Sequence, residues 1–373
     1  MNITISINRL DMGGAARVVY EIVKNIDKNY FKVKIICIDG KTNSFLEQEM
    51  LNGNYDIVFL KNPRLIKGTV ARIINKLLFI YFDIISIVRL YRELDKIRPD
   101  VIHAHQTGIW AGYWTLLHKI PLITTVHSRP DGTFNRLSEK FILKLSIFLH
   151  RIVLVAISKS NRNEIQSYWQ LDDNSARYVD NGIDIDKFFS MPHELFTFIN
   201  VSRQDKNKNQ SLILRAFSKL YHENPSILMK LILVGDGDRH KILIEEAESL
   251  GVKNSVEFTG YVSSAVQYFS CSDVYISSAY REGFPLSVLE AMASHLPIIA
   301  TDAGGVRDLA AENGILIPCD DEYALYSAMK KLRDDRELCL EKAKKSFEMI
   351  QNYSSANMAR NYCSVYKEFA ETK

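Results

Sequence analysis

The stretch SDVYISSAYREGFPLSVLEAMASHLPIIATD (residues 272–302) contains a strand, a loop, a helix and a second strand in succession. Apolar, β-branched residues mark the strands near 273–278 and 296–301. Pro285 is expected to be the first residue of the helix, because its missing N–H costs nothing at that position. Strands and helices that alternate in this way build a parallel sheet, so the stretch predicts an α/β fold.

The same alternation runs along the chain of 373 residues. We predict strands near 2–9, 32–38, 55–60, 100–105, 121–127, 151–157, 176–180, 196–202, 228–234, 255–259, 273–278, 296–301 and 314–317. Helices are expected to begin near Gly14, Phe45, Leu65, Thr107, Phe134, Lys159, Lys208, Asp238, Ser263, Pro285 and Gly305, and helices continue after Pro318. The alternation occurs twice, which predicts two Rossmann-like, doubly wound parallel-sheet domains that face a central cleft.

The domain junction is expected where the pattern pauses, in KFFSMPHEL at residues 187–195. We therefore predict an N-terminal domain of residues 1–190 and a C-terminal domain of residues 191–373. The last helix, at about 355–373, is expected to pack back on the N-terminal domain.

Composition excludes several classes of protein. The five cysteines are scattered and include no C-x-x-C pair, which argues against a disulfide framework or a thiolate zinc site. The N-terminus lacks the apolar core of a signal peptide. The run LLFIYFDIISIV (residues 77–88) is too short and too charged to span a bilayer. A cytoplasmic protein in a reducing compartment is expected.

Charge is distributed unevenly between the two halves of the chain. Residues 1–190 contain 26 Lys and Arg against 19 Asp and Glu, whereas residues 191–373 contain 21 against 25. Basic residues interleave with aromatic and aliphatic ones in segments 61–98 and 129–162. These segments resemble amphipathic helices that lie on an anionic membrane, but ordinary core-facing helices with a solvated basic face explain them equally well. Nucleic acid is not expected as a partner, since no binding module accompanies the charge.

Glycine loops follow several predicted strands. Gly13 and Gly14 open the first helix, where backbone N–H groups can approach a phosphate. The loop is not G-x-G-x-x-G, and Asp39 is the only acidic candidate for a ribose, which disfavours a nicotinamide cofactor. Gly235 and the pair Tyr261-Val262 lie in loops that could approach a nucleotide base. All of these are equally consistent with tight turns.

Charged residues gather at two strand ends in the C-terminal half. Arg203 follows the strand near 196–202 and Lys208 is expected to open the next helix, so the two cations could neutralise a diphosphate or belong to a solvated loop. In REGFPLSVLEAMA (residues 281–293), the free N–H groups of Leu286 and Ser287 suit an anion. Two nearby acids, Glu282 and Glu290, could accept paired hydrogen bonds from sugar hydroxyls.

Two histidines, His103 and His105, lie two positions apart on a strand and therefore face one side of it. An H-x-H pair can bind zinc, but no third ligand with suitable spacing is visible in the sequence. We expect histidines at the cleft edge or in the core, and no metal.

These motifs, taken together, resemble glycosyltransferase family 4, the retaining enzymes with the GT-B fold. The family's Glu-x7-Glu motif is present as E-GFPLSVL-E, and the resemblance extends over nearly the whole chain through MGGAARV, DVIHAH, TTVHS, DNGIDIDKF, VSRQDKNKN, LVGDGD, VEFTGYV and ATDAGGVRDL. The resemblance implies a metal-independent transferase, without a cofactor, that uses a nucleoside diphosphate sugar and retains its anomeric configuration.

The resemblance also implies roles for individual residues. Arg203 and Lys208 would hold the donor diphosphate, Glu290 the ribose and Glu282 the donor sugar, while the Gly13-Gly14 loop would close over the phosphate. Catalysis would depend on Glu282, His127, Arg203 and Lys208, with His127 as a positioning group near donor and acceptor. Further backbone contacts to the donor would come from Gly283, Phe284 and Leu286, and the acceptor-side candidates are Arg17, His105 and His127. Many relatives have Glu where this chain has Ala16, so the role of that Glu is in doubt here.

The function expected on these grounds is transfer of a hexose or N-acetylhexosamine, from a UDP-linked donor, to a lipid-linked saccharide. Such an acceptor would be a precursor of a bacterial cell-surface polysaccharide, O-antigen, capsule or glycolipid, at the inner face of the plasma membrane. The alternatives are another GT-B enzyme, such as a non-hydrolysing UDP-sugar epimerase, and a nucleotide-sugar-binding protein that has lost catalysis. A protein of the latter kind would be expected to lack Glu282, Arg203 or Lys208, and all three are present.

Overall fold

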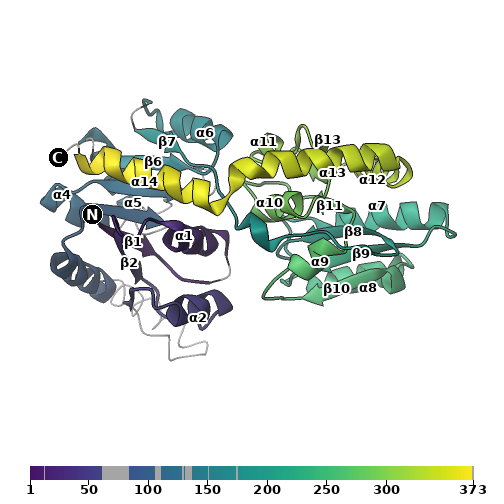
Figure 1. The fold of residues 1–373 in the computed structure, drawn as a ribbon, viewed down its shortest axis with the longest axis horizontal. Helices are drawn as coiled ribbons and strands as arrows, with labels where there is room; N and C mark the ends of the chain where they lie inside the picture. The colour runs from purple at the N-terminus through teal and green to yellow at the C-terminus, as the bar shows by residue number, and fades with distance from the viewer. Residues whose placement is uncertain are drawn as a thin grey trace. The chain divides into compact units, whose positions relative to one another are not determined.

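The structure is a computed structural model that describes residues 1–11, 13–60, 84–105, 111–127, 130, 137–149, 151–173 and 175–371. The chain forms two compact units (Figure 1). The first unit comprises Met1–Asn181 together with Ala356–Lys373, and the second comprises Gly182–Ser355.

The first unit is built on a parallel sheet of seven strands within its described residues, in the order β3-β2-β1-β4-β5-β6-β7. The strands β4, β5 and β6 are buried along their whole length, as expected for a parallel sheet covered on both faces. The strand bounds are β1 (Asn2–Ile7), β2 (Lys32–Cys37), β3 (Ile57–Phe59), β4 (Val101–His105), β5 (Leu122–Val126), β6 (Ile152–Ala156) and β7 (Ala176–Tyr178).

Helices cover both faces of this sheet. One face packs against the helical residues 84–97 and three further helices, through a core that includes Leu90, Trp114, Ile142 and Ile165. The other face carries His103, which contacts Tyr362 and Tyr366 of α14. The helix bounds in this unit are α1 (Gly14–Asn25), α2 (Phe45–Asn52), α4 (Ala111–His118), α5 (Leu137–Phe148), α6 (Lys159–Trp169) and α14 (Ser355–Glu371).

The second unit repeats the design with a six-stranded parallel sheet in the order β10-β9-β8-β11-β12-β13. Its strands are β8 (Phe196–Val201), β9 (Met229–Val234), β10 (Val256–Gly260), β11 (Val274–Ser277), β12 (Ile298–Thr301) and β13 (Gly314–Ile317). Its helices are α7 (Gln210–Glu223), α8 (His240–Ser249), α9 (Val266–Ser270), α10 (Leu286–Ala293), α11 (Arg307–Ala310), α12 (Glu322–Asp334) and α13 (Arg336–Ile350).

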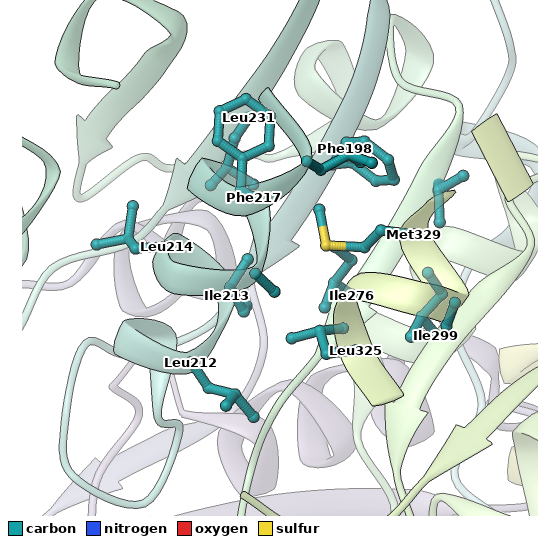
Figure 2. Close-up of a cluster of buried hydrophobic side chains, with 14 of the residues drawn as sticks. Phe198, Leu212, Ile213, Leu214, Phe217, Leu231, Ile276, Ile299, Leu325 and Met329 are labelled. Atoms are coloured by element: carbon teal, nitrogen blue, oxygen red, sulfur yellow. The ribbon is translucent and has the colours of Figure 1, made fainter. Parts of the chain in front are cut away.

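The core of the second unit lies between its sheet and two helices, α7 and α12. Phe198, Leu231 and Ile276 project from the sheet, and they meet Phe217 of α7 and Met329 of α12 (Figure 2). All of these side chains are almost completely buried. Removing a buried side chain of this size typically costs about 3–5 kcal/mol of stability, so the cluster holds the strands in place behind the loops that follow them.

In both sheets the chain reverses its direction of winding at one point. In the first sheet, β1 pairs with β2 on one side and with β4 on the other. In the second, β8 pairs with β9 on one side and with β11 on the other. In open α/β sheets, ligands bind beyond the carboxyl ends of the strands at such a point, because the helices that follow the two neighbouring strands leave toward opposite faces.

The boundary between the units differs from the sequence-based prediction of residues 190 and 191. It falls between Asn181 and Gly182, because the segment that follows already belongs to the second unit. Ile183 forms a parallel bridge with Ser354, and the N–H of Met191 donates to the carbonyl of Ser270, 2.7 Å away. The segment around 187–195 is irregular, as expected, but it packs on the second unit.

Every predicted strand is present, whereas several helices begin later than predicted. α7 begins at Gln210 rather than Lys208, α8 at His240 rather than Asp238, and α10 at Leu286 rather than Pro285. Similar shifts affect α9 and α11, and helix ends are the least certain part of a prediction from residue patterns. Leu65, Thr107 and Phe134, where further helices are expected to begin, lie outside the described residues.

Candidate functional site

An ion pair between Lys208 and Glu282 joins the loops that follow β8 and β11. Lys208 Nζ donates a hydrogen bond to Oε1 of Glu282, and only 21% and 12% of the two side chains are exposed. The loops leave neighbouring strands, so the pair lies at the point where the winding of the second sheet reverses. Charges this poorly solvated are costly unless they are paired, so each side chain stabilises the charge of the other.

Polar contacts hold the two loops together around this pair. Ser278 Oγ donates to the carbonyl of Lys208 at 2.8 Å. The side-chain amide of Asn207 donates to the carbonyl of Arg281 at 3.0 Å, and the N–H of Tyr280 donates to the carbonyl of Asn207 at 2.8 Å. Sequence reasoning did not single out Ser278 or Asn207, because their partners lie about 70 positions away along the chain.

Glu290 lies in the second turn of α10 and is 7% exposed. The hydroxyl of buried Tyr275 lies 2.8 Å from the hydroxyl of Ser287, on the first turn of the same helix. Burial raises the pKa of the Tyr275 phenol, and the negative charges of Glu282 and Glu290 raise it further. The structure therefore brings both glutamates of the Glu-x7-Glu pattern close to one buried tyrosine.

The start of α10 faces the same region of the second unit. Pro285 is the residue before the helix, with φ −74° and ψ 122°, rather than its first residue. Leu286 and Ser287 occupy the first turn, where backbone N–H groups have no partner within the helix. A helix start of this kind can bind an anion. The helix begins one residue later than expected from the sequence.

Two glycines that follow β12 fix the backbone of the Glu282 loop. The N–H of Glu282 donates to the carbonyl of Ala303, and the N–H of Gly305 donates to the carbonyl of Glu282, both at 3.2 Å. Gly304 has φ +69°, and a Cβ on Gly305 would lie 1.4 Å from the carbonyl oxygen of Gly283. The quoted stretch ATDAGGVRDL contains these glycines, but their role follows only from this backbone contact.

Arg203 extends from the loop after β8 into solvent, with 76% of its side chain exposed. Its Nε donates to Oδ2 of Asp205 at 2.6 Å, and Oδ1 of the same carboxylate accepts from the N–H of Lys208 at 3.1 Å. Lys208 is therefore a loop residue, held by Asp205, rather than the first residue of a helix. Both predicted diphosphate-binding cations lie in one short loop.

The glycine loop after β9 packs directly on the Arg203 loop. Gly235 has φ +129°, and a Cβ there would lie 2.1 Å from the carbonyl oxygen of Ser202. The N–H of Gly235 also donates to the carbonyl of Gly260, 3.0 Å away, at the end of β10. The next two residues, Tyr261 and Val262, follow β10, and the Tyr261 side chain is largely exposed. This glycine has a demonstrable structural role, because no other residue fits there.

Two other predicted donor contacts lie in the loop that leads to α10. Gly283 forms the close backbone contact with Gly305 described above. Phe284 is 5% exposed, and its ring centroid lies 5.7 Å from that of Tyr353. Any contact of Phe284 with a ligand would therefore come from its backbone, as the family resemblance implies.

In the first unit, Gly13 and Gly14 lie at the start of α1, after β1. Gly13 is the residue before the helix, and its N–H donates to the carboxylate of Asp11 at 2.9 Å. Arg17 lies one turn further along α1 and is partly buried. Ala16, where many relatives have Glu, is 1% exposed.

Three histidines meet at the ends of β4 and β5. His103 and His105 are fully buried on β4, with ring centroids 4.1 Å apart, so they do face one side of the strand. His105 Nδ1 lies 2.7 Å from Nε2 of His127, which directly follows β5 and is partly exposed. Among the described residues, the His105 ring thus contacts a partly exposed histidine, His127.

Burial keeps this histidine cluster neutral. It lowers the pKa of His103 to about 3 and that of His127 to about 4, and it lowers the pKa of His105 well below the ordinary value of 6.5. Neighbouring imidazoles lower the pKa values of His103 and His105 further, because like charges would repel. At neutral pH the three rings can exchange hydrogen bonds but carry no charge.

The part of the chain that the structure describes contains neither a metal-binding cluster nor a membrane-spanning helix. No group of three or more His, Cys, Asp or Glu side chains there is arranged to hold a metal ion. No helix formed by those residues combines the length and apolarity needed to cross a bilayer.

Comparison with known protein families covers most of the sequence. The model described as Glycosyltransferase Family 4 matches residues 12–187, and the model described as Glycosyl transferases group 1 matches residues 183–349. Together the two models extend from residue 12 to residue 349.

Among curated proteins, the chain is similar to the UDP-Gal:alpha-D-GlcNAc-diphosphoundecaprenol alpha-1,3-galactosyltransferase of Escherichia coli, with 23% identity over 88% of this chain and 86% of that protein. It is also 22% identical to the N-acetylgalactosamine-N,N'-diacetylbacillosaminyl-diphospho-undecaprenol 4-alpha-N-acetylgalactosaminyltransferase of Campylobacter jejuni, over 62% of this chain and 64% of that protein.

Solved structures share the whole fold. The HepE protein of Anabaena in complex with UDP aligns over 99% of this chain and 100% of its own, with a TM-score of 0.79 and 17% identity. A glycosyltransferase from Rickettsia africae aligns over 100% and 99% of the two chains, with a TM-score of 0.81 and 19% identity.

The contact between Gly305 and Gly283 predicts the effect of a single added methyl group. Gly305→Ala should destabilise the second unit by about 3 kcal/mol or more, because the Cβ would overlap backbone atoms that cannot yield. Gly251→Ala is the matched control: it has φ +69° but no atom nearer than 3.5 Å, and should cost only about 1 kcal/mol. Equal decreases in melting temperature for the two variants would contradict the conclusion that the backbone of Gly283 leaves no room for a side chain at position 305.

The buried histidines predict a pH-dependent stability of the first unit. Between about pH 4 and 6.5 the unfolded chain binds protons that the folded chain excludes, so stability should rise with pH in this window and be fully present above it. Each histidine contributes a slope of up to about 1.4 kcal/mol per pH unit.

Tryptophan fluorescence during urea unfolding measures this slope, because all three tryptophans precede residue 182. His127→Gln should give a shallower slope than the wild type, because it removes one of the buried imidazoles. A flat profile from pH 6.5 to 5, or equal slopes in His127→Gln and wild type, would refute the prediction.

Proposed function

Because the chain belongs to glycosyltransferase family 4, within the group 1 glycosyl transferases of GT-B fold, we propose that it transfers a hexose or N-acetylhexosamine from a UDP-linked donor to a lipid-linked saccharide. The transfer retains the anomeric configuration and needs no metal ion. The acceptor is a precursor of a cell-surface polysaccharide or glycolipid, and the reaction takes place at the cytoplasmic face of the plasma membrane.

The observation that carries this proposal is the Lys208–Glu282 pair beside Glu290 and the start of α10. A nucleoside diphosphate sugar has an anionic centre flanked by two groups of hydroxyls. The loops after β8 and β11 offer two cations and a helix start for the anion, and Glu282 before that helix and Glu290 in its second turn offer carboxylates for hydroxyls. In this proposal Glu290 binds the ribose and Glu282 the transferred sugar.

The ion pair also suggests how the site responds to the donor. Lys208 neutralises Glu282 in the ion pair. A bound diphosphate competes for the ammonium group of Lys208, which releases the Glu282 carboxylate to accept hydrogen bonds from sugar hydroxyls. Binding of the diphosphate would therefore free the Glu282 carboxylate to bind the sugar.

Stabilisation of the leaving group supplies the catalysis. As the bond between the anomeric carbon and the UDP oxygen breaks, negative charge grows on the diphosphate near Arg203, Lys208 and the start of α10. The acceptor oxygen attacks the anomeric carbon from the face that UDP leaves, and its proton passes to the departing diphosphate. His127, which is neutral at pH 7, positions substrate oxygens by hydrogen bonding.

Two relatives support the choice of acceptor. The names of the E. coli and C. jejuni enzymes specify diphosphoundecaprenol-linked saccharides, and the name of the E. coli enzyme specifies a UDP-linked sugar. A lipid-linked acceptor requires the enzyme to work at a membrane, so a surface that binds lipid is part of the proposal.

Exposed apolar and basic side chains of the first unit suit such a surface. Phe141 and Phe148 of α5 are 62% and 78% exposed, seven positions apart, with the exposed Lys144 between them. Ile84 and Val88, four positions apart in the helical residues 84–97, are also exposed, next to Arg89. Aromatic groups with adjacent cations are typical of helices that lie on anionic lipid. The rest of segments 61–98 and 129–162 lies partly outside the described residues.

A donor panel tests the activity. We expect slow release of UDP from one or two of UDP-glucose, UDP-galactose, UDP-N-acetylglucosamine and UDP-N-acetylgalactosamine in the presence of EDTA, and little nucleotide release from GDP- or ADP-linked sugars. NMR of the first sugar released should show the anomer of the donor. If no donor is hydrolysed and none raises the melting temperature, the proposal fails.

Charge removal tests the diphosphate assignment in the same assay. Lys208→Ala and Arg203→Ala should each lower kcat/KM about 10- to 150-fold, because a lost charge-assisted contact costs about 1.5–3 kcal/mol. Lys206→Ala is the matched control, since it removes an exposed cation from the same loop. Near-normal rates in the first two variants, or an equal loss in the control, would contradict the assignment.

Vesicle flotation tests the lipid surface. The protein should float with vesicles that contain phosphatidylglycerol at low salt and should detach at high salt. Phe141→Ser with Phe148→Ser should abolish flotation, whereas Leu228→Ser with Tyr323→Ser, at exposed positions of the second unit, should not. Absence of wild-type flotation at low salt would refute this part of the proposal.

A further inference from the structure

His103 and His105 lie side by side on β4, but their hydrogen bonds differ. Both nitrogens of the His103 ring are engaged by hydroxyl groups: Nδ1 lies 2.7 Å from the hydroxyl of Tyr366, and Nε2 lies 2.7 Å from that of Thr125. The Thr125 hydroxyl is also 3.0 Å from that of Tyr362. His103 is thus a satisfied core histidine that ties β4 and β5 to α14.

Among the described residues, only one of the two ring nitrogens of His105 has a hydrogen-bond partner. Its Nδ1 lies 2.7 Å from Nε2 of His127, while its own Nε2 is buried and has no hydrogen-bond partner among the described residues. The two rings are nearly parallel, 26° apart, with centroids separated by 5.0 Å. No hydroxyl group of the described residues therefore fixes the tautomer of His105. Its tautomer depends on the hydrogen bond with His127.

A neutral imidazole carries one proton, so only two arrangements of protons give a hydrogen bond between Nδ1 of His105 and Nε2 of His127. In the first, Nδ1 of His105 donates to Nε2 of His127, which leaves Nε2 of His105 bare and places the proton of His127 on Nδ1. In the second, Nε2 of His127 donates to Nδ1 of His105, which places a proton on the buried Nε2 of His105 and leaves Nδ1 of His127 bare.

Burial distinguishes the two arrangements. The first leaves an unused lone pair in the core, whereas the second leaves an N–H there without an acceptor, and orphaned buried N–H groups are the rarer of the two. Because His127 is partly exposed, water can solvate its Nδ1 in either form. The difference in free energy between the two arrangements therefore depends on the buried Nε2 of His105. A doubly protonated ring is excluded at neutral pH because burial lowers the pKa of His103 to about 3, that of His127 to about 4 and that of His105 well below its ordinary value.

We propose that His105 is a positioning residue that holds His127 in the neutral, Nδ1-protonated tautomer, so that His127 offers a hydrogen-bond donor to an oxygen of the bound substrate. His127 then cannot act as a base near pH 7, because its Nε2 accepts from His105 and its Nδ1 already carries a proton. The inference rests on the proposed function only for the nature of the substrate; the tautomer itself follows from the contacts of the histidines.

The test is the ring-nitrogen NMR spectrum of the protein with 15N-labelled histidine at pH 7.5. Long-range proton–nitrogen correlations distinguish protonated from bare ring nitrogens, and the spectra of His127→Gln and His105→Gln assign the two rings. We expect protonated Nδ1 and bare Nε2 in both His105 and His127. A protonated Nε2 in either ring, or averaged signals that indicate exchange between tautomers, would overturn the proposal.

Two substitutions of His105 then separate positioning from packing. His105→Leu fills the space without a donor, so His127 should lose its Nδ1-protonated form and kcat should fall about tenfold, with the donor KM changed less than about twofold. His105→Gln retains an N–H donor and should restore most of the rate and the wild-type His127 spectrum. His118→Gln is the control for loss of a histidine elsewhere in the first unit.

The results also separate this inference from the proposed function. Equal loss of rate in His105→Leu and His105→Gln, with His127 unchanged in the spectrum, would reduce His105 to a packing role and overturn the inference. Normal UDP release with the reversed tautomers would overturn it while the proposed function stands. Failure to release UDP from any donor, with the expected tautomers, would remove the proposed function alone. If His105→Leu does not fold, the wild-type spectrum still decides the tautomer.

Discussion

The contact on which the second unit's site depends is the ion pair between Lys208 and Glu282. It joins the ends of β8 and β11, the two strands between which the winding of the sheet reverses. Neither charge is well solvated, so separating the two side chains would leave each charge uncompensated. The ion pair therefore favours the conformation in which the two loops lie close together. Around the pair, Ser278 and Asn207 join the two loops, and Gly305 leaves room for the backbone of Gly283. The rest of the site is arranged by this constraint.

The two units share one sheet topology but carry chemically different side chains at the ends of their strands. Each has a parallel sheet whose winding reverses at its centre, and each carries polar side chains on the strand ends beside that point. The second unit holds charged groups, which suit an anionic diphosphate. The first unit holds buried imidazoles that stay neutral, which suit the uncharged oxygens of sugars. In the proposed function, leaving-group stabilisation and substrate positioning are thereby assigned to different units of the chain.

Much of this arrangement follows from local patterns in the sequence. Apolar runs predicted every described strand, because a parallel sheet buried on both faces requires continuous apolar residues. The burial of Glu290 followed from its apolar neighbours on a short helix. By contrast, the pairing of Lys208 with Glu282, 74 positions apart, depends on how two loops meet, which no local pattern records. The contact of His103 with Tyr366, 263 positions away, cannot be predicted from local sequence patterns for the same reason. The domain boundary was misplaced because an irregular segment can pack on either neighbour.

The most direct test of the central claim is a crystal structure of the protein with UDP. The account predicts that the ribose hydroxyls lie within about 3.2 Å of the Glu290 carboxylate, with the diphosphate in hydrogen-bond reach of Lys208 and Arg203. In that structure the Lys208 ammonium should have exchanged Glu282 for a phosphate oxygen. UDP bound elsewhere, or bound with the Lys208–Glu282 pair intact and no contact to Glu290, would contradict the account.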